Sequence, residues 1–187
     1  MSDIRKFQDL NLYHNPKDFR GKSKLIVQLW WICYALFFKT SPQVLYGWRR
    51  FLLRAFGAEI GKNVIVRPSA EITYPWKVKI GDNSWIGDQV VLYSLGEIII
   101  GSNTVISQRS YICTGTHNYK KMEFPILAKK IIIEDECWLA TDVFVAPGTK
   151  INKGVVVGAR SSVFKDLEPY SVFAGSPVKL IKKREIE

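Results

Sequence analysis

A chain of 187 residues, 47% of them hydrophobic, is long and apolar enough to bury one sizeable core, which excludes a wholly disordered protein. Its formal net charge of +10 gathers in residues 1–60, 120–130 and 178–187, around a nearly neutral body. No recognisable nucleic-acid-binding motif accompanies this charge, so nucleic acid is not expected as a partner, and smaller anions or an anionic membrane surface fit the charge at least as well.

Residues 1–59 are expected to form a helical segment. The apolar run 25–38 has 14 residues, fewer than the roughly 20 that cross a membrane, and predicts a buried or interfacial helix that stops near Thr40. A second helix is expected to begin with Ser41 as N-cap and Pro42 at its first position, and to end at Gly57.

The second helix is amphipathic. Five apolar residues share one face at helical spacing: Val44, Leu45, Trp48, Leu52 and Ala55. Three arginines lie outside that face: Arg49, Arg50 and Arg54. We expect the apolar face to pack on the rest of the protein, and the alternative is a basic helix that rests on a membrane surface.

From Ile60 onward an aliphatic residue recurs every six positions. The sixteen positions are Ile60, Val66, Ile72, Ile80, Ile86, Leu92, Ile100, Ile106, Ile112, Ile133, Leu139, Val145, Ile151, Val157, Val163 and Val172. A period of six fits neither an α-helix nor an alternating strand. It is the signature of a hexapeptide β-helix, in which each hexad forms one flat face of a coil.

Three hexads make one coil, and the extra residues between hexads all fall at one corner of the resulting prism. The longest insertion, 118–132, has 15 residues and begins immediately after His117, the one histidine in the repeats. Long loops that leave a regular scaffold usually carry function. His117 is therefore either a general base at the root of this loop or an ordinary loop histidine.

Cysteine usage indicates the compartment. The three cysteines, Cys33, Cys113 and Cys137, are odd in number and lack metal-ligand spacing, which is typical of free thiols under reducing conditions. The polar N-terminus does not resemble a secretory signal. We expect a cytoplasmic protein without a metal, either free or at the inner face of the membrane.

Together with the hexads, three stretches carry a resemblance to a known family: TGTHNY, WLATDVFVAPGTKINKGVVVGARSSVFKDL and FAGSPVKLIKK. The chain resembles the hexapeptide-repeat O-acetyltransferases, above all those of colanic-acid and other exopolysaccharide clusters, with galactoside, maltose and nodulation-factor acetyltransferases as relatives. The resemblance implies an all-β fold, a left-handed parallel β-helix of five to six coils over 60–177 with a basic tail 178–187. It also implies a homotrimer in which acetyl-CoA and a sugar acceptor meet between subunits.

The resemblance assigns His117 the role of the family's catalytic histidine, which removes the proton of a sugar hydroxyl. Glu97 ends the same face one coil earlier, where strands stack about 4.8 Å apart, and is a candidate to orient the imidazole. The alternative is a solvated carboxylate at a corner. Asp88 and Tyr93 are candidates for binding the acceptor.

The family places acetyl-CoA along the C-terminal coils. By motif position this implies five contacts: Thr141, Ala159, Lys165, Lys179 and Lys182. Two departures concern these contacts, because Phe164 stands where relatives often have Thr and Ala140 where they often have Gly.

Other proteins built from hexapeptide repeats fit less well. A zinc carbonic anhydrase needs three histidine ligands and the chain has two histidines. A sugar nucleotidyltransferase needs a Gly-rich nucleotide domain that 59 helical residues do not supply. An acetyltransferase for a small acceptor such as serine, and a catalytically silent scaffold or binding module, remain alternatives.

Overall fold

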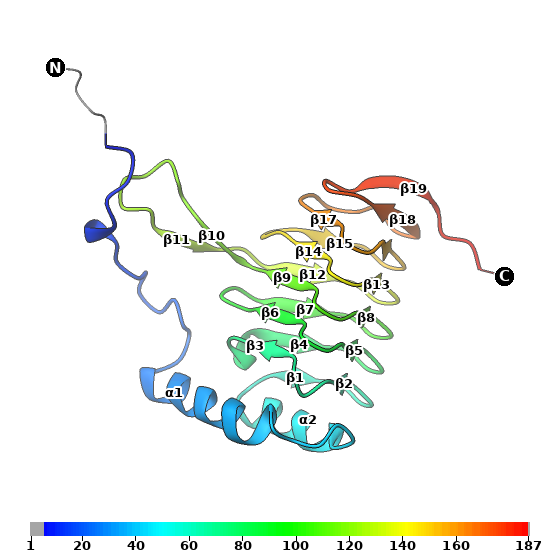
Figure 1. Ribbon diagram of the computed structural model, residues 1–187, viewed down its shortest axis with the longest axis horizontal. Helices are drawn as coiled ribbons and strands as arrows, with labels where there is room; N and C mark the ends of the chain where they lie inside the picture. The colour runs from blue at the N-terminus through cyan, green and yellow to red at the C-terminus, as the bar shows by residue number, and fades with distance from the viewer. Residues whose placement is uncertain (1–5, 187) are drawn as a thin grey trace.

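The computed structural model describes residues 6–186 and shows a parallel β-helix closed at its N-terminal end by helices (Figure 1). Three sheets form its three faces. The first face consists of β1 (Glu59–Ile60), β4 (Val78–Ile80), β7 (Ile98–Ile100), β12 (Ile131–Ile133) and β15 (Lys150–Ile151). The second consists of β2 (Ile65–Val66), β5 (Trp85–Ile86), β8 (Val105–Ile106), β13 (Trp138–Leu139), β16 (Val156–Val157), β18 (Ser171–Ala174) and β19 (Lys179–Lys183). The third consists of β3 (Glu71–Ile72), β6 (Val91–Tyr93), β9 (Tyr111–Cys113), β14 (Phe144–Val145) and β17 (Ser162–Val163).

The hexad positions form the core, as the sequence predicts. Equivalent residues stack in register, so that Ile60 pairs with Ile80 and Ile80 with Ile100. Fifteen of the sixteen predicted positions are buried, from Ile60 to Val163. The predicted hexapeptide β-helix is therefore confirmed, with five complete coils and part of a sixth.

The sixteenth position, Val172, is wrong. In the last coil the buried residues are Leu167, which bridges to Ile151, and Phe173, which pairs with Val157. These two are also six residues apart, but the connection from Val163 to Leu167 is two residues shorter than a hexad. The repeat frame therefore restarts at Leu167, and Val172 is only partly buried.

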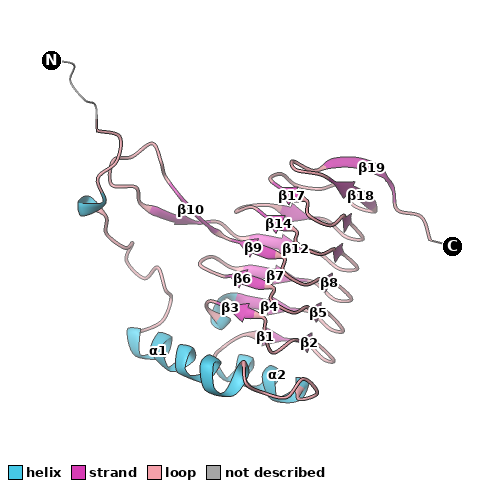
Figure 2. Ribbon diagram, in the orientation of Figure 1, coloured by secondary structure: helices cyan, strands magenta, loops and turns pink. Residues whose placement is uncertain are grey.

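The helices form a cap across the first coil, and Figure 2 shows helix chiefly at this end of the molecule. They comprise α1 (Lys24–Cys33), continued by the π-helical η2 (Tyr34–Phe38), and α2 (Tyr46–Ala55). The short 3-10 helices η1 (Leu10–Leu12) and η3 (Pro75–Lys77) lie outside this cap. The predicted helix over 25–38 is confirmed, and no helix within residues 6–186 is long and apolar enough to cross a membrane.

The predicted end of α2 is confirmed and its predicted start is wrong. Gly57 follows the helix with φ +90°, and the amides of Gly57 and Ala58 bond to the carbonyls of Arg54 and Leu53, which is a Schellman end. At the other end, α2 begins at Tyr46 rather than after Ser41. The Ser41 hydroxyl is buried and accepts a hydrogen bond from Arg49 instead of capping the helix.

The orientation of α2 also differs from the prediction, because its arginines face the coils. Backbone N–H groups of coil one donate hydrogen bonds to carbonyls of coil two that point toward the cap. These coil-two carbonyls belong to Ile80, Ser84, Ile86 and Leu92. Coil one has no coil beneath it, so the equivalent carbonyls need other donors. The cap supplies them as Arg54 to Ile60 (2.7 Å), Arg50 to Val64 (2.9 Å), Arg49 to Val66 (2.7 Å) and Trp30 to Ile72 (2.8 Å). Side chains of the cap thus replace a missing coil, and Arg49 is wholly buried.

An N-terminal arm, residues 6–22, runs beside the β-helix from α1 to the projecting hairpin (Figure 1). The arm is fixed to the coils where the Trp76 indole donates to the Arg20 carbonyl (2.7 Å) and the Lys77 ammonium to the Phe19 carbonyl (2.7 Å). Its far end reaches the hairpin, since the Asp9 amide donates to the Met122 carbonyl (2.8 Å). Residues far apart in the sequence therefore meet at the hairpin tip.

Candidate active site

The long insertion forms a β-hairpin that leaves the corner between the third and first faces. Its strands are β10 (Gly115–His117) and β11 (Ile126–Ala128), paired antiparallel with His117 opposite Ile126. The excursion begins at Gly115, three residues earlier than the predicted start at 118, so His117 lies on the hairpin rather than on the coil. A Cβ at Gly115 would lie 2.8 Å from a methyl carbon of Leu95 and from a ring carbon of Tyr93, so a larger residue there requires the hairpin or these side chains to shift.

The hairpin fixes the imidazole of His117. Its Nδ1 lies 2.9 Å from the carbonyl oxygen of Phe124, and the two rings stack with centroids 4.2 Å apart and planes 10° apart. A carbonyl only accepts, so Nδ1 carries the proton in this contact and the neutral ring keeps its lone pair on Nε2. The ring is half-buried. An imidazole in this tautomer has a lone pair on Nε2 that can accept a proton.

Sequence reasoning missed two of the groups around His117. Phe124 contributes a backbone carbonyl, from a residue with φ +48° in the hairpin turn, and a backbone acceptor leaves no signature in the residue type. Tyr13, from the arm, has its ring centroid 6.5 Å from that of His117. Nothing in the sequence links a residue of the N-terminal segment to the hairpin.

Glu97 lies at the same corner as His117, one coil earlier, but its carboxylate has other partners. It pairs with Lys130 at 2.9 Å and with Lys79 at 3.6 Å. The hydrogen bond from Lys130 holds the pKa of Glu97 below its usual value. The contact that orients the imidazole comes from Phe124, so the orienting role of Glu97 stays a prediction.

The two acceptor candidates lie apart. Asp88 sits at the corner between the second and third faces, where it binds Arg67 (2.8 Å) and Ser69 (2.7 Å). Burial raises the pKa of Asp88, but the hydrogen bonds from Ser69 and Arg67 outweigh it and the net shift is downward. Tyr93 packs beneath the hairpin against Gly115, and burial raises the pKa of its phenol.

The cofactor candidates also divide between corners. Thr141 and Ala159 occupy the same corner as Asp88 in two consecutive coils, where the amide of Arg160 donates to the Thr141 carbonyl (2.8 Å). Lys165 follows β17 at the corner between the third and first faces. The hairpin leaves the same corner two coils closer to the cap. Lys179 and Lys182 lie exposed on β19, which pairs antiparallel with β18.

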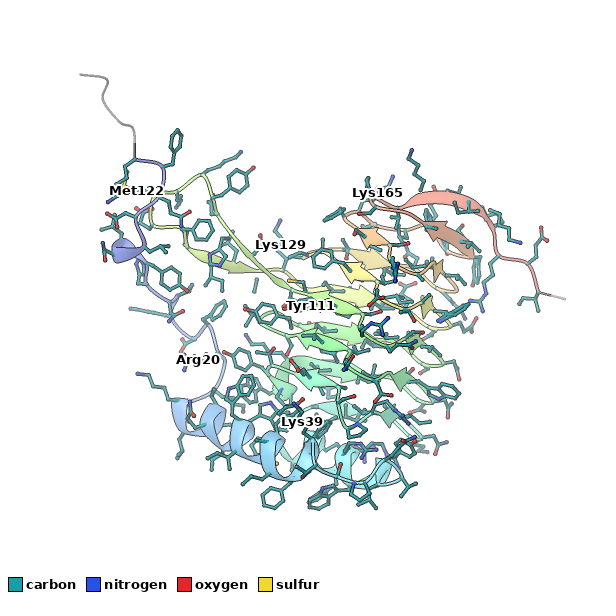
Figure 3. All side chains as sticks on the ribbon, viewed as in Figure 1. Arg20, Lys39, Tyr111, Met122, Lys129 and Lys165 are labelled. Carbon is teal, nitrogen blue, oxygen red and sulfur yellow. The ribbon has the colours of Figure 1, made fainter. Side chains whose placement is uncertain are left out.

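Six of the nine candidates of one chain thus follow two edges of the prism. One edge carries Asp88, Thr141 and Ala159, and the other carries His117, Glu97 and Lys165. Between them, the third face bears a ladder of aromatic rings 5.9–6.3 Å apart: Tyr93, Tyr111, Phe144 and Phe164. Figure 3 marks Met122 at the hairpin tip, Lys129 at its base, Tyr111 in the ladder and Lys165 beyond it.

The two departures from the family pattern have structural neighbours. Phe164 ends the ladder beside Phe144 and is 59% exposed, so it extends an outward apolar strip where relatives often have Thr. Ala140 accepts the Ser110 hydroxyl through its carbonyl (2.9 Å), a backbone contact that its side chain does not affect. Among residues 6–186, no group of three or more His, Cys, Asp or Glu is placed to hold a metal ion.

No family model matches the chain. Over 177 residues it is 58% identical to the putative colanic acid biosynthesis acetyltransferase WcaF of Escherichia coli strain K12, covering 95% of this chain and 97% of that one. The crystal structure of a maltose O-acetyltransferase from Clostridium difficile 630 is 26% identical, with a TM-score of 0.78 over 88% of this chain and 90% of that one. A hexapeptide-repeat acetyltransferase of Vibrio cholerae, complexed with acetyl coenzyme A, shares the fold along both whole chains with a TM-score of 0.79 and 21% identity.

Proposed function

Since the chain belongs to the hexapeptide-repeat acetyltransferases of polysaccharide biosynthesis, we propose that it moves the acetyl group of acetyl-CoA onto a sugar hydroxyl during exopolysaccharide synthesis. Membership confirms the resemblance carried by the hexads and the TGTHNY stretch, and it makes the protein an acetyltransferase. The observation that carries the proposed chemistry is the hydrogen bond of His117 Nδ1 to the Phe124 carbonyl.

The proposed reaction uses one base. A sugar hydroxyl is a poor nucleophile at neutral pH because it holds its proton tightly. His117 Nε2 takes that proton as the hydroxyl oxygen attacks the thioester carbonyl, and the ring becomes an imidazolium stabilised by its bond to the Phe124 carbonyl. Collapse of the tetrahedral intermediate breaks the carbon–sulfur bond, and the imidazolium returns the proton to the leaving thiolate.

Acetyl-CoA is proposed to lie along the later coils. Thr141 and Ala159 present backbone groups at one corner, while Lys165, Lys179 and Lys182 offer exposed cations for its phosphates. The relative from Vibrio cholerae with acetyl coenzyme A supports a cofactor on this scaffold. Asp88 and Tyr93 remain proposed acceptor contacts, and Glu97 a proposed partner of the histidine.

We further propose a homotrimer. In one chain the third face separates the edge with His117 from the edge with Thr141 and Ala159, so neither edge alone assembles a base beside a thioester. A neighbouring subunit that places its edge with Thr141 and Ala159 against this hairpin would complete the site. We place the enzyme in the cytoplasm, at the inner face of the membrane, with the three free cysteines as support for a reducing compartment.

The proposal is tested with the purified protein, acetyl-CoA and paired acceptors. Saccharides from the host exopolysaccharide are compared with serine, and thiol release is followed while mass spectrometry identifies the product. We expect a saccharide that gains one alkali-labile acetyl group, which is diagnostic of an O-ester. Faster transfer to serine, or no transfer to any saccharide, would favour the small-acceptor enzyme or the silent scaffold.

A further inference from the structure

The outer side of the cap is an apolar surface. Large side chains of α1, η2 and α2 point away from the coils, each at least 40% exposed: Leu29, Trp31, Leu36, Phe37, Trp48 and Phe51. We call these six residues the apolar cap face. Figure 3 shows side chains on the outer side of the cap, away from the β-helix. Apolar patches of this extent are uncommon on monomeric soluble proteins and mark interaction sites.

The apolar cap face results from the inward turn of the arginines. Arg49, Arg50 and Arg54 leave the solvent side of α2 to bond the carbonyls of coil one, so the opposite side of the helix faces outward. The two helices form one surface there, because the Trp48 indole donates to the Phe37 carbonyl (3.0 Å) and stacks on Phe51 with centroids 5.6 Å apart. The face is therefore built rigidly into the cap.

Charge identifies what covers this face. Residues 19–58 contain seven Lys or Arg and no Asp or Glu. Three of these cations are exposed: Lys22 at the end of the arm just before α1, Lys24 at the start of α1, and Lys39 directly after η2. Two copies meeting through this face would bring like charges together without a counterion. Anionic lipid phosphates complement the lysines, and aromatic side chains suit the interfacial region of a bilayer.

We propose that the apolar cap face docks on an anionic membrane surface, with Leu29, Trp31, Leu36, Phe37, Trp48 and Phe51 entering the interface and Lys22, Lys24 and Lys39 facing lipid phosphates. The cap lies in the interface and does not cross it, because no helix within residues 6–186 is long and apolar enough to span a bilayer. This inference rests on the proposed location at the inner membrane face and does not depend on acetyl transfer.

Docking fixes the orientation of the site. The cap closes one end of the solenoid, so the coils stand upright on the membrane (Figure 1). The hairpin leaves coil three, two strand spacings or roughly 10 Å above coil one. His117 then works close above the lipid headgroups, on the side of the prism rather than at its free end.

The test is co-sedimentation of the full chain with lipid vesicles. Phosphatidylcholine vesicles are compared with ones that contain roughly 30% phosphatidylglycerol, as salt rises from about 0.05 to 0.5 M. The variants are Phe37→Glu with Phe51→Glu, and Lys24→Gln with Lys39→Gln. The matched control is Ile186→Glu, an apolar-to-acidic change at a residue that is 94% exposed and lies near the C-terminus.

We expect binding to anionic vesicles that weakens with salt, a loss of at least ten-fold in each double variant, and wild-type binding for Ile186→Glu. Should the phenylalanine variant fail to fold, the lysine variant decides. Equal binding to both vesicle types, no binding, or pairing of caps in sedimentation that Phe37→Glu relieves would overturn the proposal. Thiol release with a soluble acceptor should be unchanged in all variants. A wild-type protein that binds vesicles but shows no turnover would refute the proposed acetyl transfer and leave the membrane docking intact.

Discussion

The imidazole of His117 does two separable things, and asparagine at this position keeps only one of them. His117→Asn places an amide nitrogen near the site of Nδ1, within reach of the Phe124 carbonyl, but has no atom equivalent to Nε2. His117→Ala removes both. Comparing the two variants therefore distinguishes a base from an anchor of the hairpin.

The magnitudes of the two effects differ enough to decide. One neutral hydrogen bond contributes about 1 kcal/mol, so a loosened hairpin costs about five-fold in rate. A lost general base costs ~10²–10⁴-fold. His117 is half-buried on a hairpin outside the core, so neither variant opens a core cavity. We expect both to lose at least two orders of magnitude in turnover, within a few-fold of each other.

The assay is thiol release from acetyl-CoA with a saccharide acceptor, measured beside acetyl-CoA affinity and sedimentation. Cofactor affinity and oligomeric state should match the wild type in both variants, because Thr141, Ala159 and Lys165 belong to later coils. If either variant kept more than roughly a tenth of wild-type turnover, the loss would be too small for a general base, His117 would be an anchor of the hairpin, and the catalytic assignment would fail.

Three further outcomes follow from the geometry. Arg49→Ala should lower the free energy of unfolding, measured by urea denaturation, by about 3–5 kcal/mol because it leaves buried carbonyls unpaired. Arg50→Ala loses one partly exposed hydrogen bond and should lower the free energy of unfolding by about 1 kcal/mol. Equal effects of the two variants would contradict the capping role. Gly115→Ala should displace the hairpin and lower turnover with acetyl-CoA affinity unchanged. Leu95→Ala in the same chain removes one of the two close contacts and should restore part of the turnover, whereas full activity of the single variant would show that the contact is not tight. Burial raises the pKa of the Cys137 thiol to about 11, so at pH 8 its thiolate fraction is about a hundredth of that of an ordinary thiol. Labelling of Cys137 by a thiol-reactive reagent should therefore be slow in the native protein. Rapid labelling of Cys137 in the native protein would contradict this expectation.

The β-helix was predictable because burial in this fold repeats along the chain. Each hexad places one aliphatic residue inside, so fifteen positions from Ile60 to Val163 could be assigned from spacing alone. Val172 failed because spacing carries no information about a shortened connection, and the frame restarts at Leu167. Val172 and Phe173 are both apolar, so hydrophobicity alone does not show which of the two the last coil buries.

The orientation of α2 was not predictable from its own pattern. A helical wheel places apolar residues inward because it treats the neighbour as an apolar surface. The end of a β-helix is instead a row of backbone carbonyls that need hydrogen-bond donors. Arg49, Arg50 and Arg54 supply these donors, which apolar side chains cannot do. His117 was found through its motif, while Phe124 and Tyr13 depend on how the hairpin and arm fold.

The uniform spacing of the early coils fixes the distance of each coil from the cap. Ile60, Ile80 and Ile100 stack at intervals of twenty residues in one unbroken register. Removing one such interval between the cap and the hairpin would keep every face aligned, and would lower His117 toward the cap by one strand spacing, about 4.8 Å. Whole coils are thus the unit in which the height of the reactive histidine above the base of the molecule is set, and chains of this design could match acceptors of different reach by adding or losing a coil.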